Sequence, residues 1–122
     1  MKMKNLKSLI LLMLLVGGNL LIGQTVANKW TKDRCQKISS KITQELTLSK
    51  QDSTLFNEIV LEKFVFEQEN IKKATTNEEK GEIYRQSMTQ FKEKLKASFT
   101  ENDKSKKILD WYVINYKTFN SL

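Results

Sequence analysis

The sequence predicts an all-α fold in which four amphipathic helices, the two middle ones long, pack as a small bundle. The chain of 122 residues contains no proline, and beyond Gly23 its only glycine is Gly81. Tight turns that depend on these residues are therefore scarce, which disfavours strand-rich folds. Apolar residues also recur at intervals of three and four, the spacing of one helix face. Short polar links between such segments complete the pattern of an all-helical domain.

Residues 1–23 are expected to be a secretory signal peptide, and 24–122 a single helical domain. Three lysines precede an apolar run over 9–16, and small residues favour cleavage after Gly23 or, as the alternative, after Ala27. The apolar run is shorter than the about 20 residues that a membrane span needs. We therefore expect a cleaved protein in the periplasm or secreted, with membrane association not favoured.

The charge pattern argues against a nucleic-acid partner. The formal net charge is +7, but three of the lysines belong to the signal segment. The remaining basic residues are interspersed with acidic ones along the predicted helices, whereas nucleic-acid binding needs clustered lysine and arginine. A mild preference for acidic surfaces, unfolded acidic proteins or anionic lipid head groups is compatible with this balance.

Catalytic chemistry is not expected either. The chain has no histidine, which removes the commonest general base and the usual Ser-His and Cys-His pairs. It has too few glycines for a phosphate-binding loop. Its carboxylate clusters, at 67–69 and 78–82, lack the spacing of a calcium-binding loop. We therefore predict no enzyme activity, no cofactor and no metal site.

The first helix is predicted over 29–45, with Trp30 as an anchor at its start. Its apolar stripe consists of Cys35, Ile38, Ile42 and Leu46. The single cysteine cannot form an internal disulfide. It either packs as a small buried residue or cross-links two copies in an oxidising compartment.

The second helix is predicted over 49–72. Ser49 is a good N-cap, and Asp52 lies three residues later, near the positive end of the helix dipole. This helix carries two apolar sectors separated by charged residues. The first sector contains Leu55, Phe56, Ile59 and Phe66. The second contains Val60, Leu61, Phe64 and Val65.

A helix that is buried on one side needs only one apolar sector. The second helix is therefore either sandwiched between neighbours or presents its second sector to a partner. Its richness in β-branched and aromatic residues leaves a strand as a remote alternative.

The third helix is predicted over 76–99, with Thr76 and Glu79 as a capping box. Its stripe consists of Tyr84, Met88, Phe91, Leu95 and Phe99. The fourth helix is predicted over 100–119, starting at Thr100 with Asp103 at the third helical position. Its stripe consists of Ile108, Leu109, Tyr112, Val113, Tyr116 and Phe119.

Two of the predicted helix starts have nearly the same sequence. Each places a large apolar residue before a hydroxyl residue, with aspartate three positions after the hydroxyl. The first consists of Leu48, Ser49 and Asp52, and the second of Phe99, Thr100 and Asp103. Together with the export signal, these segments resemble the LTXXQ motif of the Spy-like family of periplasmic chaperones and envelope-stress proteins. Both copies have aspartate where the family has glutamine, and aspartate at that position can still cap a helix.

The resemblance implies a cradle-shaped dimer of long helices that holds unfolded proteins loosely and without ATP. On that basis we expect an exported holdase that binds unfolded or misfolded envelope proteins. The residues expected to bind clients are Val60, Leu61, Phe64 and Val65 of the second sector, with Lys63, Lys72 and Lys73 beside them. The alternative function is a small structural or regulatory interaction protein of the envelope with one defined partner, for which the second sector would be a fixed interface.

Overall fold

The protein is described here by a computed structural model that covers residues 27–101 and 103–122. Its helices confirm the all-α prediction and the two long middle helices, and the described residues contain no strand. The α-helices are α2 (Lys29–Leu46), α3 (Lys50–Ile71), α4 (Asn77–Ser98) and α5 (Lys104–Asn115), followed by a 3₁₀ helix, η1 (Tyr116–Ser121). The predicted signal peptide lies outside the described residues.

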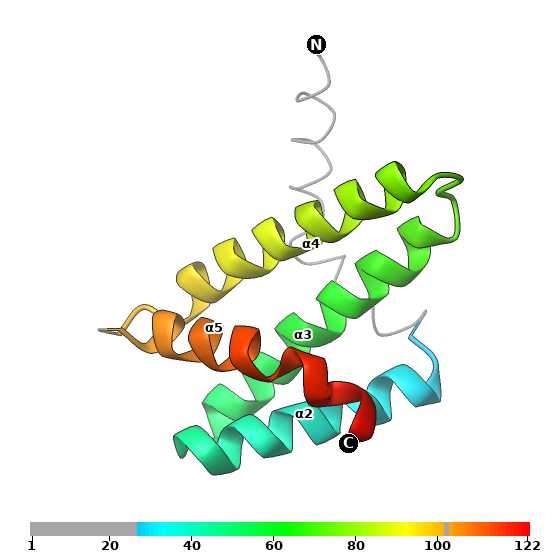
Figure 1. The fold of residues 1–122 in the computed structure, drawn as a ribbon. Helices are drawn as coiled ribbons and strands as arrows, with labels where there is room; N and C mark the ends of the chain where they lie inside the picture. Colours follow the sequence, from blue (N-terminus) through cyan, green and yellow to red (C-terminus); the bar gives the residue numbers. More distant parts are fainter. Residues whose placement is uncertain (1–26, 102) are drawn as a thin grey trace.

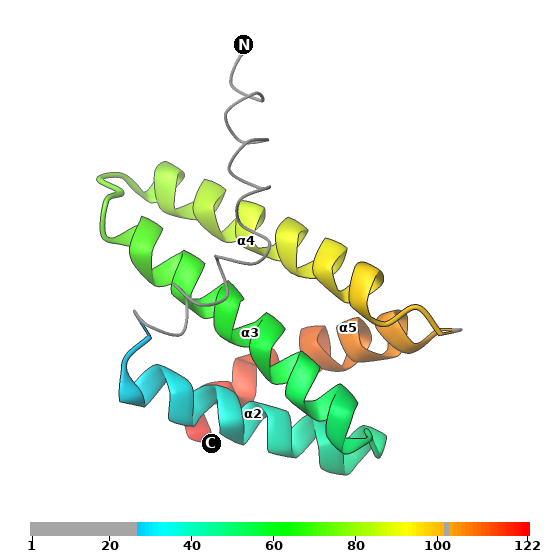
Figure 2. The ribbon, with the colours of Figure 1, turned by 180° about the vertical axis from the view of Figure 1, so that it is seen from behind.

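Helix α3 is the central element of the fold. It lies between α2 and α4, and it packs extensively against both (Figures 1 and 2). Helix α5 crosses one face of this arrangement and contacts α4 and α2, so that the chain ends close to α2 (Figure 1). One surface pocket lies where the C-terminal half of α3 meets the start of α2, and another where the start of α3 meets the start of α5.

Helix α2 starts and packs largely as predicted. The side chain of Asn28 caps it by accepting the backbone N–H of Thr31 at 2.8 Å. Cys35, Ile38 and Ile42 are fully buried, as their spacing predicts. The expectation that Trp30 anchors the helix is wrong, because 63% of its surface is exposed. Trp30 precedes Cys35 by five positions, which is not a spacing that places two residues on one helix face.

Polar residues on α2 also face the interior, which the apolar stripe did not predict. Thr31 and Ser39 are buried. Thr31 accepts a hydrogen bond from the Gln68 amide at 2.9 Å, and the Ser39 hydroxyl donates to the Asn57 amide oxygen at 3.0 Å. These two bonds join α2 to α3 and satisfy polar groups that would be costly to bury alone.

The central position of α3 explains its two apolar sectors. Phe56 and Ile59 of the first sector are buried, and so are Val60, Leu61 and Val65 of the second. The sandwiched alternative is therefore the one that the structure adopts. The expectation that Val60, Leu61 and Val65 form an exposed stripe for clients is wrong, because neighbouring helices cover both sectors within one chain.

Helix α4 starts at the predicted capping residues, although Glu79 reaches back to the residue before the N-cap. The Thr76 hydroxyl accepts the backbone N–H of Glu79 at 3.1 Å, and the Glu79 carboxylate accepts the backbone N–H of Thr75 at 2.7 Å. This second hydrogen bond holds the pKa of Glu79 below its usual value. Phe91 and Leu95 are buried, as their spacing predicts.

The fourth helix differs from the prediction at both ends. It starts at Lys104 rather than at Thr100, and its N-cap residue Asp103 makes no side-chain cap hydrogen bond. After Asn115 the chain tightens into η1. The buried face contains Trp111, which the predicted stripe omitted, whereas Val113 of that stripe is exposed. The indole N–H of Trp111 donates to Glu45 at 2.7 Å and lowers the pKa of that carboxyl.

An aromatic cluster joins α3, α4 and α5 in the core. The Phe91 ring lies 6.5 Å from the ring of Phe56 and 4.6 Å from that of Tyr112, measured between centroids. Phe119 of η1 lies 5.3 Å from Tyr112 and 5.9 Å from Trp111. These contacts extend the core from the central helix to the end of the chain.

The burial of Cys35 gives a prediction about its reactivity. Burial raises the pKa of its thiol to about 12, so the reactive thiolate is scarce at neutral pH. We expect the native protein to react with Ellman's reagent far more slowly than free glutathione, and the urea-unfolded protein to react at once. Rapid stoichiometric labelling of the native protein, or a disulfide-linked dimer on a non-reducing gel, would contradict this.

Candidate functional site

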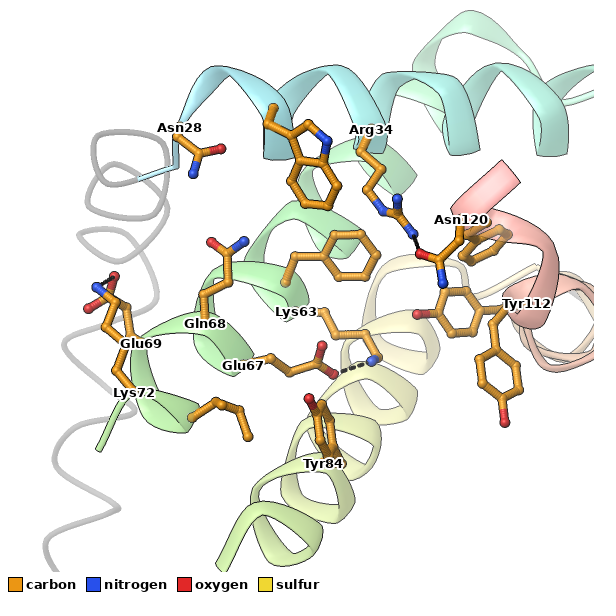
Figure 3. Close-up of a pocket in the computed structure, with 15 residues that line it drawn as sticks. Asn28, Arg34, Lys63, Glu67, Gln68, Glu69, Lys72, Tyr84, Tyr112 and Asn120 are labelled. Carbon is orange, nitrogen blue, oxygen red and sulfur yellow. Dashed lines mark hydrogen bonds and ion pairs between the residues drawn. The ribbon is translucent and has the colours of Figure 1, made fainter. Parts of the chain in front are cut away.

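A surface pocket of about 720 Å³ is lined by residues of α2, α3, α4, α5 and η1. Figure 3 shows its lining, with α2 on one side and the C-terminal half of α3 beneath. Aromatic side chains from every one of these elements line it. They are Trp30, Phe64, Tyr84, Tyr112, Tyr116 and Phe119.

Three of these aromatic side chains are exposed. Trp30 at the start of α2 is 63% exposed, Tyr84 on α4 51% and Tyr116 at the start of η1 47%. Tryptophan and tyrosine are enriched in binding interfaces relative to the rest of a protein surface. Their placement around one pocket makes this the candidate binding site.

An ion pair is buried at the floor of the pocket. The Lys63 ammonium lies 2.5 Å from Glu67, and these side chains are only 8% and 16% exposed. The Ser87 hydroxyl of α4 donates to the same Glu67 oxygen at 2.6 Å. Glu67 is therefore held by a cation on its own helix and by a hydroxyl from the neighbouring helix.

Aromatic rings surround the Lys63 ammonium on its other sides. It lies 5.5 Å from the ring centroid of Tyr112, 5.9 Å from that of Phe91 and 6.0 Å from that of Phe64. Cation–π attraction at these distances compensates part of the hydration that Lys63 loses. The lysine expected to attract acidic clients is thus committed to interactions within the chain.

Arg34 lies at the α2 side of the pocket. Its guanidinium group stacks over the Trp30 ring at 5.0 Å and donates to the Asn120 amide oxygen at 2.6 Å. The second contact joins α2 to η1 across the pocket, and Figure 3 shows it beside Tyr112. The Arg34 guanidinium and the exposed Trp30 indole therefore lie side by side in the lining of the pocket.

Of the titratable residues that line the pocket, Tyr112 is the most buried, with only 3% of its surface exposed. Burial raises the pKa of its hydroxyl above the usual value, Glu67 raises it further, and Arg34 acts in the opposite direction. The hydroxyl therefore stays protonated and can donate a hydrogen bond into the pocket.

The predicted client-binding residues divide between the pocket and other places. Lys63, Phe64 and Lys72 line the pocket, whereas Val60, Leu61 and Val65 are buried in the core. Lys73 is exposed after the end of α3 and is not part of the lining. Sequence reasoning missed the contributions of α2 and η1. The available signal was Trp30, a large aromatic residue that lies off the apolar stripe of its helix.

Another surface hollow, of about 410 Å³, brings parts of the two helix-start motifs together. Its lining includes Leu48, Ser49 and Asp52 from the first motif and Asp103 from the second. The Lys104 ammonium joins them, 2.7 Å from Asp52 and 3.1 Å from Glu101. These carboxylates, Asp52 foremost, raise the pKa of Lys104.

Only the first motif caps a helix. The Ser49 hydroxyl accepts the backbone N–H of Asp52 at 3.0 Å, which confirms the predicted cap. The expectation that Thr100 caps the fourth helix is wrong, because that helix starts four positions later, while Phe99 is buried and Thr100 is exposed. Instead, Lys104, which directly follows Asp103 of the second motif, forms an ion pair with Asp52 of the first motif.

Substitutions at the two hydroxyl residues should therefore differ in effect. Ser49→Ala removes a cap and is expected to lower the free energy of unfolding by about 1 kcal/mol. Thr100→Ala removes no cap and should change it by less than about 0.5 kcal/mol. Urea denaturation of both variants checks the contrast. Equal losses would mean that Thr100 also caps a helix.

The described residues show neither a metal site nor a membrane-spanning helix. No group of three or more histidine, cysteine, aspartate or glutamate side chains in that part of the chain could hold a metal ion. None of the helices in the same part combines the length and apolar character needed to cross a membrane. Comparison of the chain with protein-family models, with curated proteins and with solved structures gives no match.

Proposed function

We propose that this protein is an exported binding protein, without catalytic activity, that holds a short segment of another polypeptide in the aromatic pocket. The single observation that carries the proposal is the exposure of Trp30, Tyr84 and Tyr116 around one pocket. Tryptophan, tyrosine and arginine are the residues that most often dominate binding energy at protein interfaces. The pocket offers all three types.

The size of the pocket supports a short segment rather than a large client. A hollow of about 720 Å³ falls in the range of roughly 300–1,000 Å³ typical of sites for small ligands. It has room for a few side chains of an extended peptide. This favours the alternative function expected from the sequence, an interaction protein of the cell envelope with one defined partner.

An array of short peptides tethered by their C-termini tests the proposal. We expect the wild-type protein to be retained on a subset of peptides that carry large apolar residues. Trp30→Ala should weaken that binding by at least about tenfold, since the central aromatic residues of an interface cost well over 1 kcal/mol when truncated. Because Trp30 is 63% exposed, the variant should remain folded, which thermal denaturation checks.

Ile114→Ala is the matched control. Ile114 is 75% exposed and lies outside the lining of the pocket. Its truncation removes a similarly accessible apolar side chain, so binding in the pocket should be unchanged. Weaker peptide binding by Ile114→Ala would place that binding at the exposed end of α5 and reject the pocket as its site. If no peptide retains the wild-type protein, or if Trp30→Ala binds as well as the wild type, the proposal is rejected.

Holdase activity toward unfolded envelope proteins, which the resemblance implies, is the second candidate function. The observation in its favour is a separate group of exposed apolar side chains near the end of α5, where Val113 is 47% and Ile114 75% exposed. Light scattering of an aggregating denatured protein tests it. A Val113→Ser/Ile114→Ser variant should suppress aggregation less than the wild type. Lack of suppression by the wild type at a few-fold molar excess would reject this candidate.

A further inference from the structure

Among the charged side chains that line the aromatic pocket, the positive ones outnumber the negative ones by one. Lys63 pairs with Glu67 at 2.5 Å, and Lys72 pairs with Glu69 at 3.3 Å. Arg34 is the fifth charged residue of the lining. It forms no ion pair with any carboxylate in the described part of the chain. The net charge of the lining is therefore positive and is located at Arg34.

The guanidinium group of Arg34 is held in place but not saturated. Stacking on Trp30 at 5.0 Å fixes one of its faces, and one N–H group donates to Asn120. A guanidinium has five N–H donors in a planar fork, so further donors remain for a ligand. This fork matches the two oxygens of a carboxylate.

A second donor faces the same region. Tyr112 lines the pocket and is only 3% exposed. None of the hydrogen bonds among the described residues uses its hydroxyl group. Figure 3 shows Arg34, Asn120 and Tyr112 together on one side of the pocket. Burial raises the pKa of Tyr112 overall, and the positive charge of Arg34 opposes that rise.

Glu67 does not cancel this preference for an anion. Its carboxylate already has the Lys63 ammonium and the Ser87 hydroxyl as partners. A ligand carboxylate at Arg34 therefore meets a neutralised pair rather than an isolated negative charge. The aromatic rim adds apolar surface next to this donor pair.

We propose that the pocket selects a peptide segment in which an aspartate or glutamate side chain adjoins a large apolar residue. Arg34 and the Tyr112 hydroxyl hold the carboxylate, and the apolar residue packs against Trp30 and Phe64. This inference rests on the proposed function, because the pocket must first bind a peptide. Because Trp30, Tyr84 and Tyr116 are exposed around the pocket, we take an internal side chain, rather than a chain end, as the source of the carboxylate.

The peptide array described above also tests this inference. Because the peptides are tethered by their C-termini, they carry no free terminal carboxylate. The test set places aspartate, asparagine, glutamate or glutamine next to phenylalanine or leucine in otherwise identical peptides. We expect about tenfold tighter binding of the acidic member of each pair, in line with a hydrogen bond to a charged group. Added salt should reduce this ratio and leave the binding of the amide peptides nearly unchanged.

Three variants separate the role of the cation from that of the fold. Arg34→Gln should bring the ratio of acidic to amide binding close to one, and Tyr112→Phe, which removes only the hydroxyl, should reduce it a few-fold. Arg85→Gln is the matched control, because Arg85 on α4 is exposed, pairs with Glu82 and does not line the pocket. It should keep the wild-type ratio.

The outcomes distinguish this inference from the proposed function. Equal binding of acidic and amide peptides by the wild type overturns the inference and leaves the proposed function standing. An acidic preference that persists in Arg34→Gln also overturns it. Binding that appears only when the same peptides are tethered by their N-termini, and so present a free C-terminus, assigns the carboxylate to a chain end and rejects the internal side chain. If no peptide binds at all, both proposals fail.

Discussion

Replacing Phe91 with alanine is expected to lower the free energy of unfolding by about 3–5 kcal/mol, the range for a buried aromatic residue. Phe91 is 2% exposed and lies where α3, α4 and α5 meet, 4.6 Å from the Tyr112 ring and 6.5 Å from that of Phe56. Truncation leaves a cavity lined by stiff aromatic groups, which cannot close by small shifts. It also removes one wall of the aromatic cage around Lys63.

Thermal and urea denaturation followed by circular dichroism measure this effect. For a domain of this size the expected loss corresponds to a decrease in Tm of at least about 12 °C. Phe91→Leu, which keeps most of the volume, should cost less, about 1–2 kcal/mol. Tyr84→Ala on the same helix is the control, because that side chain is 51% exposed. A loss below about 1 kcal/mol in Phe91→Ala would show that the core of this protein is not centred on the aromatic cluster.

The sequence predicted most of the helices because their signals are local. Spacing of three and four placed Cys35, Ile38 and Ile42 on one buried face, and the hydroxyl and carboxylate pairs at Ser49 and Thr76 marked two helix starts. The same signal failed at Thr100. There the apolar residue before the hydroxyl, Phe99, is anchored in the core, and the chain needs several more residues to redirect before α5 starts.

The candidate site was harder to predict because it depends on which helices cross. Two apolar sectors on α3 fitted both a sandwiched helix and a helix with an open face, and only the positions of α2 and α4 decide between them. Trp30 and Arg34 gave no periodic signal, since they lie outside the buried stripe of α2. Tyr116 was predicted to lie on the buried stripe of its helix, yet it is 47% exposed. The proximity of these three residues arises because α5 and η1 cross toward the start of α2 (Figure 1). Periodicity carries no information about that crossing.

The second large effect is expected for the buried ion pair beneath the pocket. Glu67→Gln should lower the free energy of unfolding by on the order of 3 kcal/mol, because it leaves the Lys63 charge, 8% exposed, without a counter-charge. Lys63→Met should cost less, since Glu67 keeps the hydrogen bond from Ser87. The double variant Lys63→Met/Glu67→Met should recover most of the stability, to within about 1 kcal/mol of the wild type, because apolar side chains of similar length replace both charges.

A double-mutant cycle measured by urea denaturation quantifies this coupling. The exposed pair between Lys106 and Asp110 is the matched control, with the same spacing and a distance of 2.8 Å, but with side chains 72% and 56% exposed. Asp110→Asn should cost less than about 0.5 kcal/mol. If Glu67→Gln costs no more than Asp110→Asn, then water in the open pocket solvates Lys63, and the pair is not the rigid floor on which the aromatic residues are arranged. If the double variant is instead as unstable as Glu67→Gln, the cation–π contacts of Lys63 contribute to packing in a way that an uncharged side chain cannot replace.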